Sequence, residues 1–261
     1  MKTEFLQHNG VNISEYPSDD WLLAPFPRQK SPIYCNDNLA TVNRPYFLED
    51  VNFLECLNAA KSAWGENKRD ISWRLHVFLW AASSALASSD DQVFVELGTG
   101  RGYMVRALAK SGIGKKLRAY CFDSFTPNLP ISADANSADI KNRFSYIQAP
   151  SELNSLHEDI QSFNSISTRR FSFVQGLLPN SLRAYLGTFG KIDLIHIDLN
   201  HAESEIRSLE LLAPLIRNDT TLLFDDTGAP GSEEQWKAHL RFLRDLGKSP
   251  LYLPTGQCLA L

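Results

Sequence analysis

The sequence is poor in cysteine, in clustered positive charge and in long apolar runs, and each shortage excludes a class of protein. Its four cysteines lie far apart with no Cys-x-x-Cys pair, so neither a zinc site nor a disulfide framework is predicted. The 26 basic residues are outnumbered by 30 acidic ones, which argues against a sequence-independent grip on nucleic acid. The longest apolar stretch, residues 77–82, is far shorter than a membrane span.

The remaining composition is that of an ordinary globular protein, with 43% hydrophobic and 21% charged residues. A length of 261 residues is enough for one α/β domain with additions. The amino terminus lacks the charged-then-apolar pattern of a secretion signal. We therefore expect a cytoplasmic protein that binds neither nucleic acid nor membranes, with buried Cys121 and Cys258 as small hydrophobic residues.

The chain divides into two regions. Residues 1–68 form a proline-rich strap followed by a helix over 46–61, since five prolines and several aromatic residues lie between positions 16 and 45. This region is either a strap packed on the body of the protein, or a lid or oligomer arm. Residues 69–261 form the main domain, which begins with a helix over 70–86 whose N-cap candidate is Asp70.

From Val93 onward the pattern alternates between strand and helix, which predicts a parallel sheet with helices on both faces. Strands are expected at 93–96, 117–122, 171–175, 192–197 and 221–224. Helices are expected at 103–111, within 138–148, and at 151–163, 180–186, 202–212 and 232–246. The last residues, 251–261, predict two strands joined by a turn at 254–256, so that an antiparallel hairpin completes the sheet.

The stretch from Val93 to Gly102 predicts a cofactor site at a strand-to-helix junction. An apolar run leads into Glu96 and then into glycines at 98, 100 and 102, where backbone must approach a ligand closely. The third glycine falls one position too early for the dinucleotide pattern Gly-x-Gly-x-x-Gly. A Glu two residues before Gly-x-Gly-x-Gly instead resembles motif I of class I methyltransferases that use S-adenosylmethionine (SAM).

The resemblance implies that Glu96 holds the methionine end of SAM and that the loop of Gly98, Thr99, Gly100 and Gly102 passes beneath it. Ligands of open α/β sheets bind outside the carboxyl ends of the strands. Asp123, with Ser124 beside it, ends the second strand of the domain and is placed to accept hydrogen bonds from ribose hydroxyls. Two further residues at the end of the third strand, Gln175 and Gly176, are expected near the adenine.

Three carboxylates follow the fourth and fifth strands. Asp198, Asp225 and Asp226 would repel one another beside a cleft, and Mg²⁺, which prefers oxygen ligands, would resolve this. We therefore predict these three as metal ligands; the alternative is that they cap a turn and a helix. A metal that binds two neighbouring hydroxyls lowers the pKa of the reacting one, which favours methyl transfer to oxygen.

A base must take the proton from that hydroxyl, and imidazole suits the task near pH 7. His201, three residues after Asp198, is predicted as the catalytic base, and Asp198 as its catalytic partner at the metal. His196, two residues before Asp198 in the strand, is the rival, although a buried and hydrogen-bonded structural histidine is the other interpretation of that residue.

From about Trp73 to the end, the chain resembles the TylF-type, macrocin O-methyltransferase-like branch of class I methyltransferases. The matching segments are 73–82, 95–102, 122–125 with Leu129-Pro130, 175–182, 197–198 with His201, and 224–226. The resemblance implies a Rossmann-like methyltransferase fold with a mostly parallel seven-stranded sheet, a homo-oligomer, Mg²⁺ bound by the acidic residues, and methylation of sugar hydroxyls of natural products.

Departures from the family pattern leave alternatives open. Asn200 stands where many relatives carry a second Asp, and Thr227 stands where an aromatic residue follows the Asp pair. A metal-independent or hydroxylase-like relative of the same superfamily is therefore an alternative. A non-catalytic SAM-binding scaffold is a third hypothesis, disfavoured because a scaffold has no need for uncompensated carboxylates at a cleft.

Overall fold

The fold is built on one seven-stranded sheet. The structure, a computed structural model, describes residues 32–64, 70–86, 91–125, 153–163 and 170–261. The sheet order is β5-β4-β3-β6-β7-β9-β8. Its strands are β3 (Val93–Leu97), β4 (Arg118–Asp123), β5 (Phe171–Gln175), β6 (Leu194–Ile197), β7 (Thr221–Phe224), β8 (Leu251–Tyr252) and β9 (Cys258–Ala260).

The pairing pattern is the one predicted. The strands β5, β4, β3, β6 and β7 are parallel to their neighbours, whereas β9 pairs antiparallel with both β7 and β8. The terminal hairpin therefore inserts its last strand next to β7. This confirms the predicted Rossmann-like methyltransferase fold with a C-terminal antiparallel hairpin.

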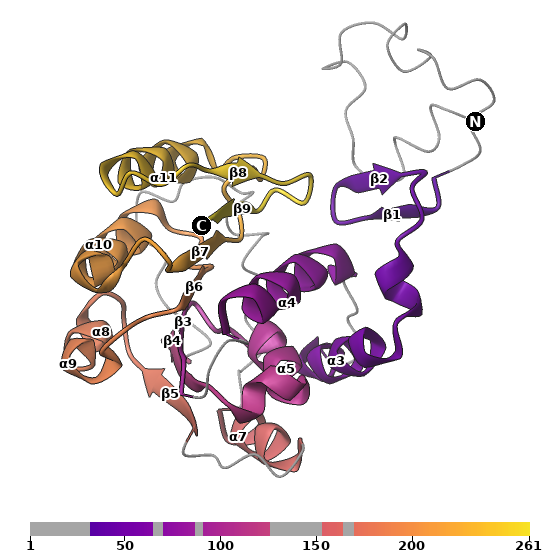
Figure 1. Cartoon of the computed structure of the whole chain (residues 1–261), viewed down its shortest axis with the longest axis horizontal. Coiled ribbons are helices and arrows are strands. Elements are labelled where there is room, and N and C mark those ends of the chain that lie inside the picture. The colour runs from indigo at the N-terminus through magenta and orange to yellow at the C-terminus, as the bar shows by residue number, and fades with distance from the viewer. Residues whose placement is uncertain (1–31, 65–69, 87–90, 126–152, 164–169) are drawn as a thin grey trace, which may run out of the picture.

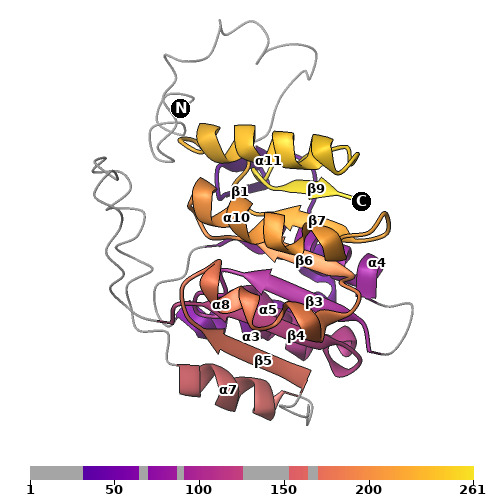
Figure 2. The same cartoon turned by 90° about the vertical axis from the view of Figure 1, so that its left-hand side faces the viewer.

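Helices cover both faces of the sheet (Figures 1 and 2). One face carries α3 (Val51–Lys61), α4 (Ser72–Leu86), α5 (Tyr103–Lys110) and α7 (Leu153–Ser162). The other carries α8 (Asn180–Arg183), α9 (Leu186–Phe189), α10 (Ala202–Leu212) and α11 (Glu233–Asp245). Among the described residues, no helix is long and apolar enough to cross a membrane.

Strand periodicity decides which residues meet α4. Side chains alternate between faces along a strand, so Phe94 and Leu194 join the core beneath α4, whereas Val95 and Ile195 join the opposite core. By the same alternation Glu96 and His196 point toward α4. These two polar side chains, near the carboxyl ends of β3 and β6, therefore lie on the α4 side of the sheet.

The amino-terminal region differs from the predicted irregular strap. Within its described part, β1 (Tyr34–Asn36) and β2 (Leu39–Thr41) form a hairpin. The two turn residues Asp37 and Asn38 have φ of +54° and +59°, which fits the two-residue turn that matches strand twist. Asp and Asn tolerate this conformation better than other non-glycine residues, and that pair was the overlooked hairpin signal. Strap residues before 32 lie outside the described part.

Two predicted helices are interrupted. The helix predicted over 46–61 starts as a separate 3₁₀ turn, because Asp50 is extended and its carboxylate caps α3 by accepting from the Asn52 and Phe53 N–H groups. The helix predicted over 180–186 is replaced by the two short helices α8 and α9, separated at Tyr185. The helix predicted within 138–148 and the domain boundary at 68 fall outside the described residues.

Candidate active site at the carboxyl edge of the sheet

The glycine loop lies between the carboxyl ends of β4 and β6. Gly98 and Thr99 donate their N–H groups to the Phe122 carbonyl, at 2.9 and 3.2 Å. On the other side Gly98 approaches β6 so closely that a Cβ would lie 2.0 Å from the Asp198 carbonyl oxygen, and its φ is +92°. Only glycine fits there. The loop ends at Gly102, the N-cap of α5.

Asp123 ties this loop to the end of β4. Its Oδ2 accepts from the Gly100 N–H at 2.8 Å, and its Oδ1 accepts from the Phe125 N–H at 2.9 Å and from the Ser124 hydroxyl at 3.2 Å. These bonds fix the carboxylate before any ligand arrives. A Cβ on Gly100 would meet nothing within 4 Å, so this part of the loop faces open space.

The end of β5 lies beside Asp123. Gln175 is its partner in the strand register, and the Gly176 N–H donates to the Asp123 carbonyl at 2.9 Å. The structure therefore brings the residues predicted for ribose and adenine to one place, next to the glycine loop.

Glu96 and His196 form a buried pair beneath the loop. Both are 1% exposed, and His196 Nδ1 lies 3.2 Å from Glu96 Oε1. Burial opposes a charge on His196, but Asp225 and Glu96 raise its pKa to about 10. The ring is therefore a cation at neutral pH. The other oxygen of Glu96, Oε2, is buried with no described hydrogen-bond partner, and such an atom invites a donor group of a ligand.

The three carboxylates predicted as metal ligands lie together. Ligand atoms of Asp198, Asp225 and Asp226 are all within 4.8 Å of one another. Burial, followed by the charges of Asp225 and Asp226, raises the pKa of Asp198 well above its ordinary value. Asn200 donates to Asp198 Oδ1 at 2.7 Å, so the residue that departs from the family pattern supports a carboxylate without adding charge.

Sequence reasoning missed Arg74, a cation in this cluster. Its Nη1 lies 2.7 Å from Asp225 Oδ2 and 2.9 Å from Asp226 Oδ1. Burial alone would raise the pKa of Asp225, but Arg74 and His196 hold it below its ordinary value. The expectation of uncompensated carboxylates was therefore wrong for two of the three. One signal was available: Arg74 lies on the stripe that Phe78 and Ala81 continue at helical spacing, and both are fully buried.

Two residues distant in sequence contact Asp225 or its partner Arg74. Asp37, in the turn of the β1–β2 hairpin, contacts Arg74 Nε at 2.5 Å. Gln257, in the turn before β9, donates to Asp225 Oδ1 at 2.9 Å and itself accepts from the Thr255 hydroxyl at 2.9 Å. Nothing in the local sequence of either residue indicates this role.

His201, the predicted base, is the N-cap of α10 and is exposed. Its Nδ1 accepts from the Ser204 N–H at 3.2 Å. In the neutral ring the proton then resides on Nε2, so the lone pair that could accept a proton faces the helix. His201 must leave this capping position before it can act as a base.

A buried network supports the loops after β6 and β7. Glu205 accepts from the Leu199 N–H at 3.1 Å and pairs with His239 Nε2 at 2.7 Å. The other ring nitrogen of His239 lies 2.9 Å from the hydroxyl of Thr227, which follows the Asp pair directly. Thr227 is thus a buried, hydrogen-bonded core position.

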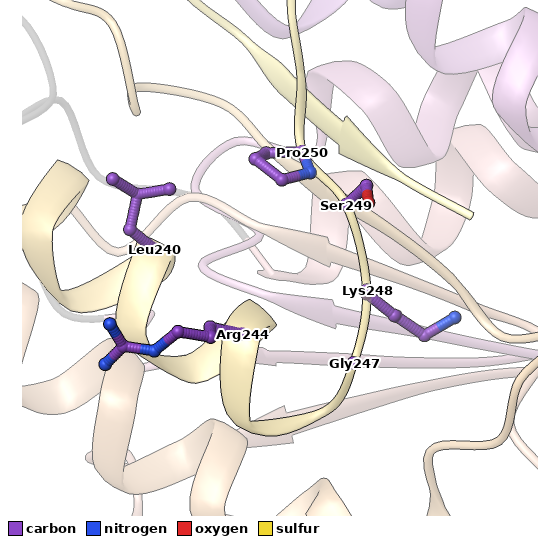
Figure 3. Close-up of a pocket in the computed structure, with 6 residues that line it drawn as sticks. All are labelled: Leu240, Arg244, Gly247, Lys248, Ser249 and Pro250. Atoms are coloured by element: carbon purple, nitrogen blue, oxygen red, sulfur yellow. The ribbon is translucent and has the colours of Figure 1, made fainter.

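A surface hollow between α11 and β8 lies elsewhere (Figure 3). It is lined by Leu240, Arg244 and residues 247–250. Lys248 in this lining donates to the carbonyls of Asn218 and Thr220, which precede β7. The hollow therefore belongs to the amino edge of the sheet, opposite the carboxylates, and takes no part in the site.

Comparisons with known proteins agree with this geometry. A family profile described as a methyltransferase domain matches residues 95–227, which include the glycine loop and all three carboxylates. No curated protein matches the sequence significantly.

Solved structures share the fold at low identity. The apo structure of CalS11, described as a TDP-rhamnose 3′-O-methyltransferase of calicheamicin biosynthesis, is 17% identical with a TM-score of 0.55, and the match covers 84% of this chain and 95% of CalS11. The O-methyltransferase NovP is 16% identical with a TM-score of 0.58, covering 72% and 78%. A putative caffeoyl-CoA O-methyltransferase from Staphylococcus aureus is 14% identical with a TM-score of 0.50, covering 82% and 94%.

The family profile spans half of the chain, and the solved structures share its fold. The resemblance predicted from the glycine loop is thereby confirmed. The chain belongs to the methyltransferase-domain family and has the class I, SAM-dependent methyltransferase fold.

Proposed function

We propose that this protein transfers the methyl group of SAM to a hydroxyl group of a small molecule, with a sugar or glycosylated natural product as the acceptor. One observation carries the proposal: the Gly98 turn contacts the Asp198 backbone, so the cofactor loop and the carboxylate cluster share one edge of the sheet. The similarity in fold to CalS11, a sugar O-methyltransferase by its description, supports the acceptor class.

On the cofactor side, the chain binds and orients SAM. Asp123 is held by backbone donors and the Ser124 hydroxyl and keeps one acceptor position, on Oδ2, for a ribose hydroxyl, since each carboxylate oxygen accepts two hydrogen bonds. Gly100 leaves room for the ligand above the loop. Glu96 supplies buried negative charge toward the methionine end, and its orphaned Oε2 fits an ammonium donor.

On the acceptor side, Asp198, Asp225 and Asp226 would hold Mg²⁺. Their donor set fits: three carboxylates within 4.8 Å offer the hard oxygen ligands that this ion prefers. When bound, the ion would lower the pKa of an acceptor hydroxyl. Gln257 and Asn200 orient two of the carboxylates from behind, as supporting hydrogen bonds do at metal sites.

We assign His201 as the base that accepts the proton of the acceptor hydroxyl. His196 is unsuited, because a ring whose pKa is about 10 is already protonated at neutral pH. His201 is exposed and begins the helix directly after the Asp198 loop. Its Nδ1 becomes available once the ring leaves Ser204.

Methyl transfer from SAM to a panel of nucleotide-linked and free sugars, followed as S-adenosylhomocysteine release, tests the proposal. We expect turnover with at least one hydroxylated acceptor and its loss in excess EDTA. SAM binding without any transfer to hydroxyl groups would contradict the acceptor assignment.

A metal-independent methyltransferase is the second candidate. Arg74 favours it, because a guanidinium already neutralises part of the carboxylate charge. Full turnover in EDTA would select this candidate over the first. Homo-oligomerisation and a cytoplasmic location stay predictions from the sequence.

A further inference from the structure

Arg74 lies on two of the three carboxylates of the proposed cation site. Its Nη1 contacts Asp225 Oδ2, the Asp225 carbonyl and Asp226 Oδ1, at 2.7, 2.9 and 2.9 Å. The side chain is only 5% exposed. Because α4 holds this guanidinium in place, its positive charge is a permanent part of the site, unlike a dissolved ion.

The amino-terminal hairpin fixes the other side of Arg74. Asp37 pairs with Arg74 Nε and is 2% exposed. The hairpin is anchored to the start of α4, where the Tyr34 hydroxyl lies 3.3 Å from the Ser72 hydroxyl and Asn36 donates to Asp70 at 3.2 Å. Figure 1 shows the hairpin beside α4. A segment outside the family match thus brings a buried carboxylate to the edge of the site.

We propose that Arg74 is a built-in competitor of the divalent cation at Asp198, Asp225 and Asp226. It screens the Asp225–Asp226 pair, so the fold tolerates these buried carboxylates without a metal ion, and it weakens cation binding. Asp37 offsets part of the guanidinium charge, so docking of the hairpin tunes cation affinity. This inference rests on the proposed function, because it assumes that these carboxylates bind a cation.

A purely structural role for Arg74 predicts the opposite sign. If Arg74 only orients the Asp pair, its removal should weaken cation binding, by ten- to a hundredfold for a supporting residue. If it competes, its removal should strengthen binding, since like charges a few ångströms apart in partly buried surroundings repel strongly. Gln257 still holds Asp225 Oδ1 in the absence of Arg74, so the orienting loss is small. We therefore expect the removal of Arg74 to strengthen cation binding.

The test is Mn²⁺ binding to the full chain, followed by electron paramagnetic resonance and calorimetry. We expect R74M to bind Mn²⁺ at least tenfold more tightly than the wild type. R74K is the matched control: it keeps the charge but loses the planar fork, and its affinity should stay within threefold of the wild type. D37N, at a turn position that asparagine tolerates, should bind severalfold more weakly.

The outcomes separate the two proposals. D198N in the R74M background should lose the tight Mn²⁺, which places it at the carboxylates. Wild-type binding with R74M equal or weaker would overturn the competitor role alone. If neither the wild type nor R74M binds Mn²⁺, the cation site fails and the inference fails with it. Should R74M not fold, D37N decides, and an unchanged affinity there would contradict the proposal.

Discussion

The two halves of the site are built by different means. At the ends of β3 and β4, backbone geometry forms the cofactor loop: Gly98 fits under β6, and Asp123 is held by N–H groups of Gly100 and Phe125. At the ends of β6 and β7, buried charges form the acidic half, with Asp225 between Arg74 and Gln257. The loop half should therefore respond to changes of shape, and the acidic half to changes of charge.

The largest effect should come from shape in the loop half. G98A places a methyl group 2.0 Å from the Asp198 carbonyl at φ +92°, so we expect a loss of ~3 kcal/mol or more in the free energy of unfolding and loss of SAM binding. G100A is the matched control, since its Cβ meets nothing within 4 Å and only the strain of φ +52°, about 1–2 kcal/mol, remains. Chemical denaturation measures both, and equal losses would contradict the close approach.

A charge change in the acidic half should leave the loop half intact. D198N keeps the shape of the side chain but removes one ligand charge, so we expect turnover to fall about a hundredfold or more, as for loss of a metal ligand. The affinity for S-adenosylhomocysteine should stay within threefold of the wild type. Parallel loss of turnover and cofactor affinity would show that the halves do not act separately.

The acidic half should also respond to pH through His196. Its pKa is raised to about 10 from an unfolded value near 6.5, so its stabilising contribution is fully present below about pH 6.5 and is lost as the pH rises through 10. H196Q removes this titration. In EDTA, the stability difference between wild type and H196Q should shrink by on the order of 2 kcal/mol between pH 6 and pH 8. Urea unfolding at the two pH values measures it, and parallel curves would contradict the charged pair.

The smallest effect is expected at Thr227, which directly follows Asp225 and Asp226. T227V removes a buried hydroxyl 2.9 Å from His239 Nδ1 and should cost about 1–2 kcal/mol in stability, because the ring nitrogen loses its partner. T188V is the control, since the Thr188 hydroxyl bonds to the Tyr185 carbonyl at the exposed surface. Thermal unfolding should show little change for the control. A similar loss of stability in both variants would contradict a stabilising role for the network of Glu205, His239 and Thr227.

The difference between the two halves also explains which parts of the site could be predicted from the sequence. The loop half was predictable because its determinants are neighbours in the chain: Glu96 to Gly102 shows both the turn and its spacing. Asp198, Asp225 and Asp226 were predictable as strand-end residues, since parallel strands bring their carboxyl ends to one edge.

The partners of these residues were not predictable in the same way. Arg74 lies 151 positions from Asp225, and Gln257 lies 32 positions from it, so no local pattern links them. Their roles depend on which side chains the packed helix α4 and the terminal hairpin bring to the site. The interruption of the first helix at Asp50 is likewise a choice between a cap and a continuous helix that composition alone does not decide.

Isothermal titration calorimetry of the wild-type chain and D198N with S-adenosylhomocysteine tests most directly whether the glycine loop binds the cofactor independently of the carboxylates. We expect both proteins to bind about one equivalent per chain with similar affinity, in EDTA and in Mg²⁺, while methyl transfer by D198N is slower by about a hundredfold or more. Absence of binding in both proteins would contradict the assignment of the loop as a SAM site, and with it the proposed reaction.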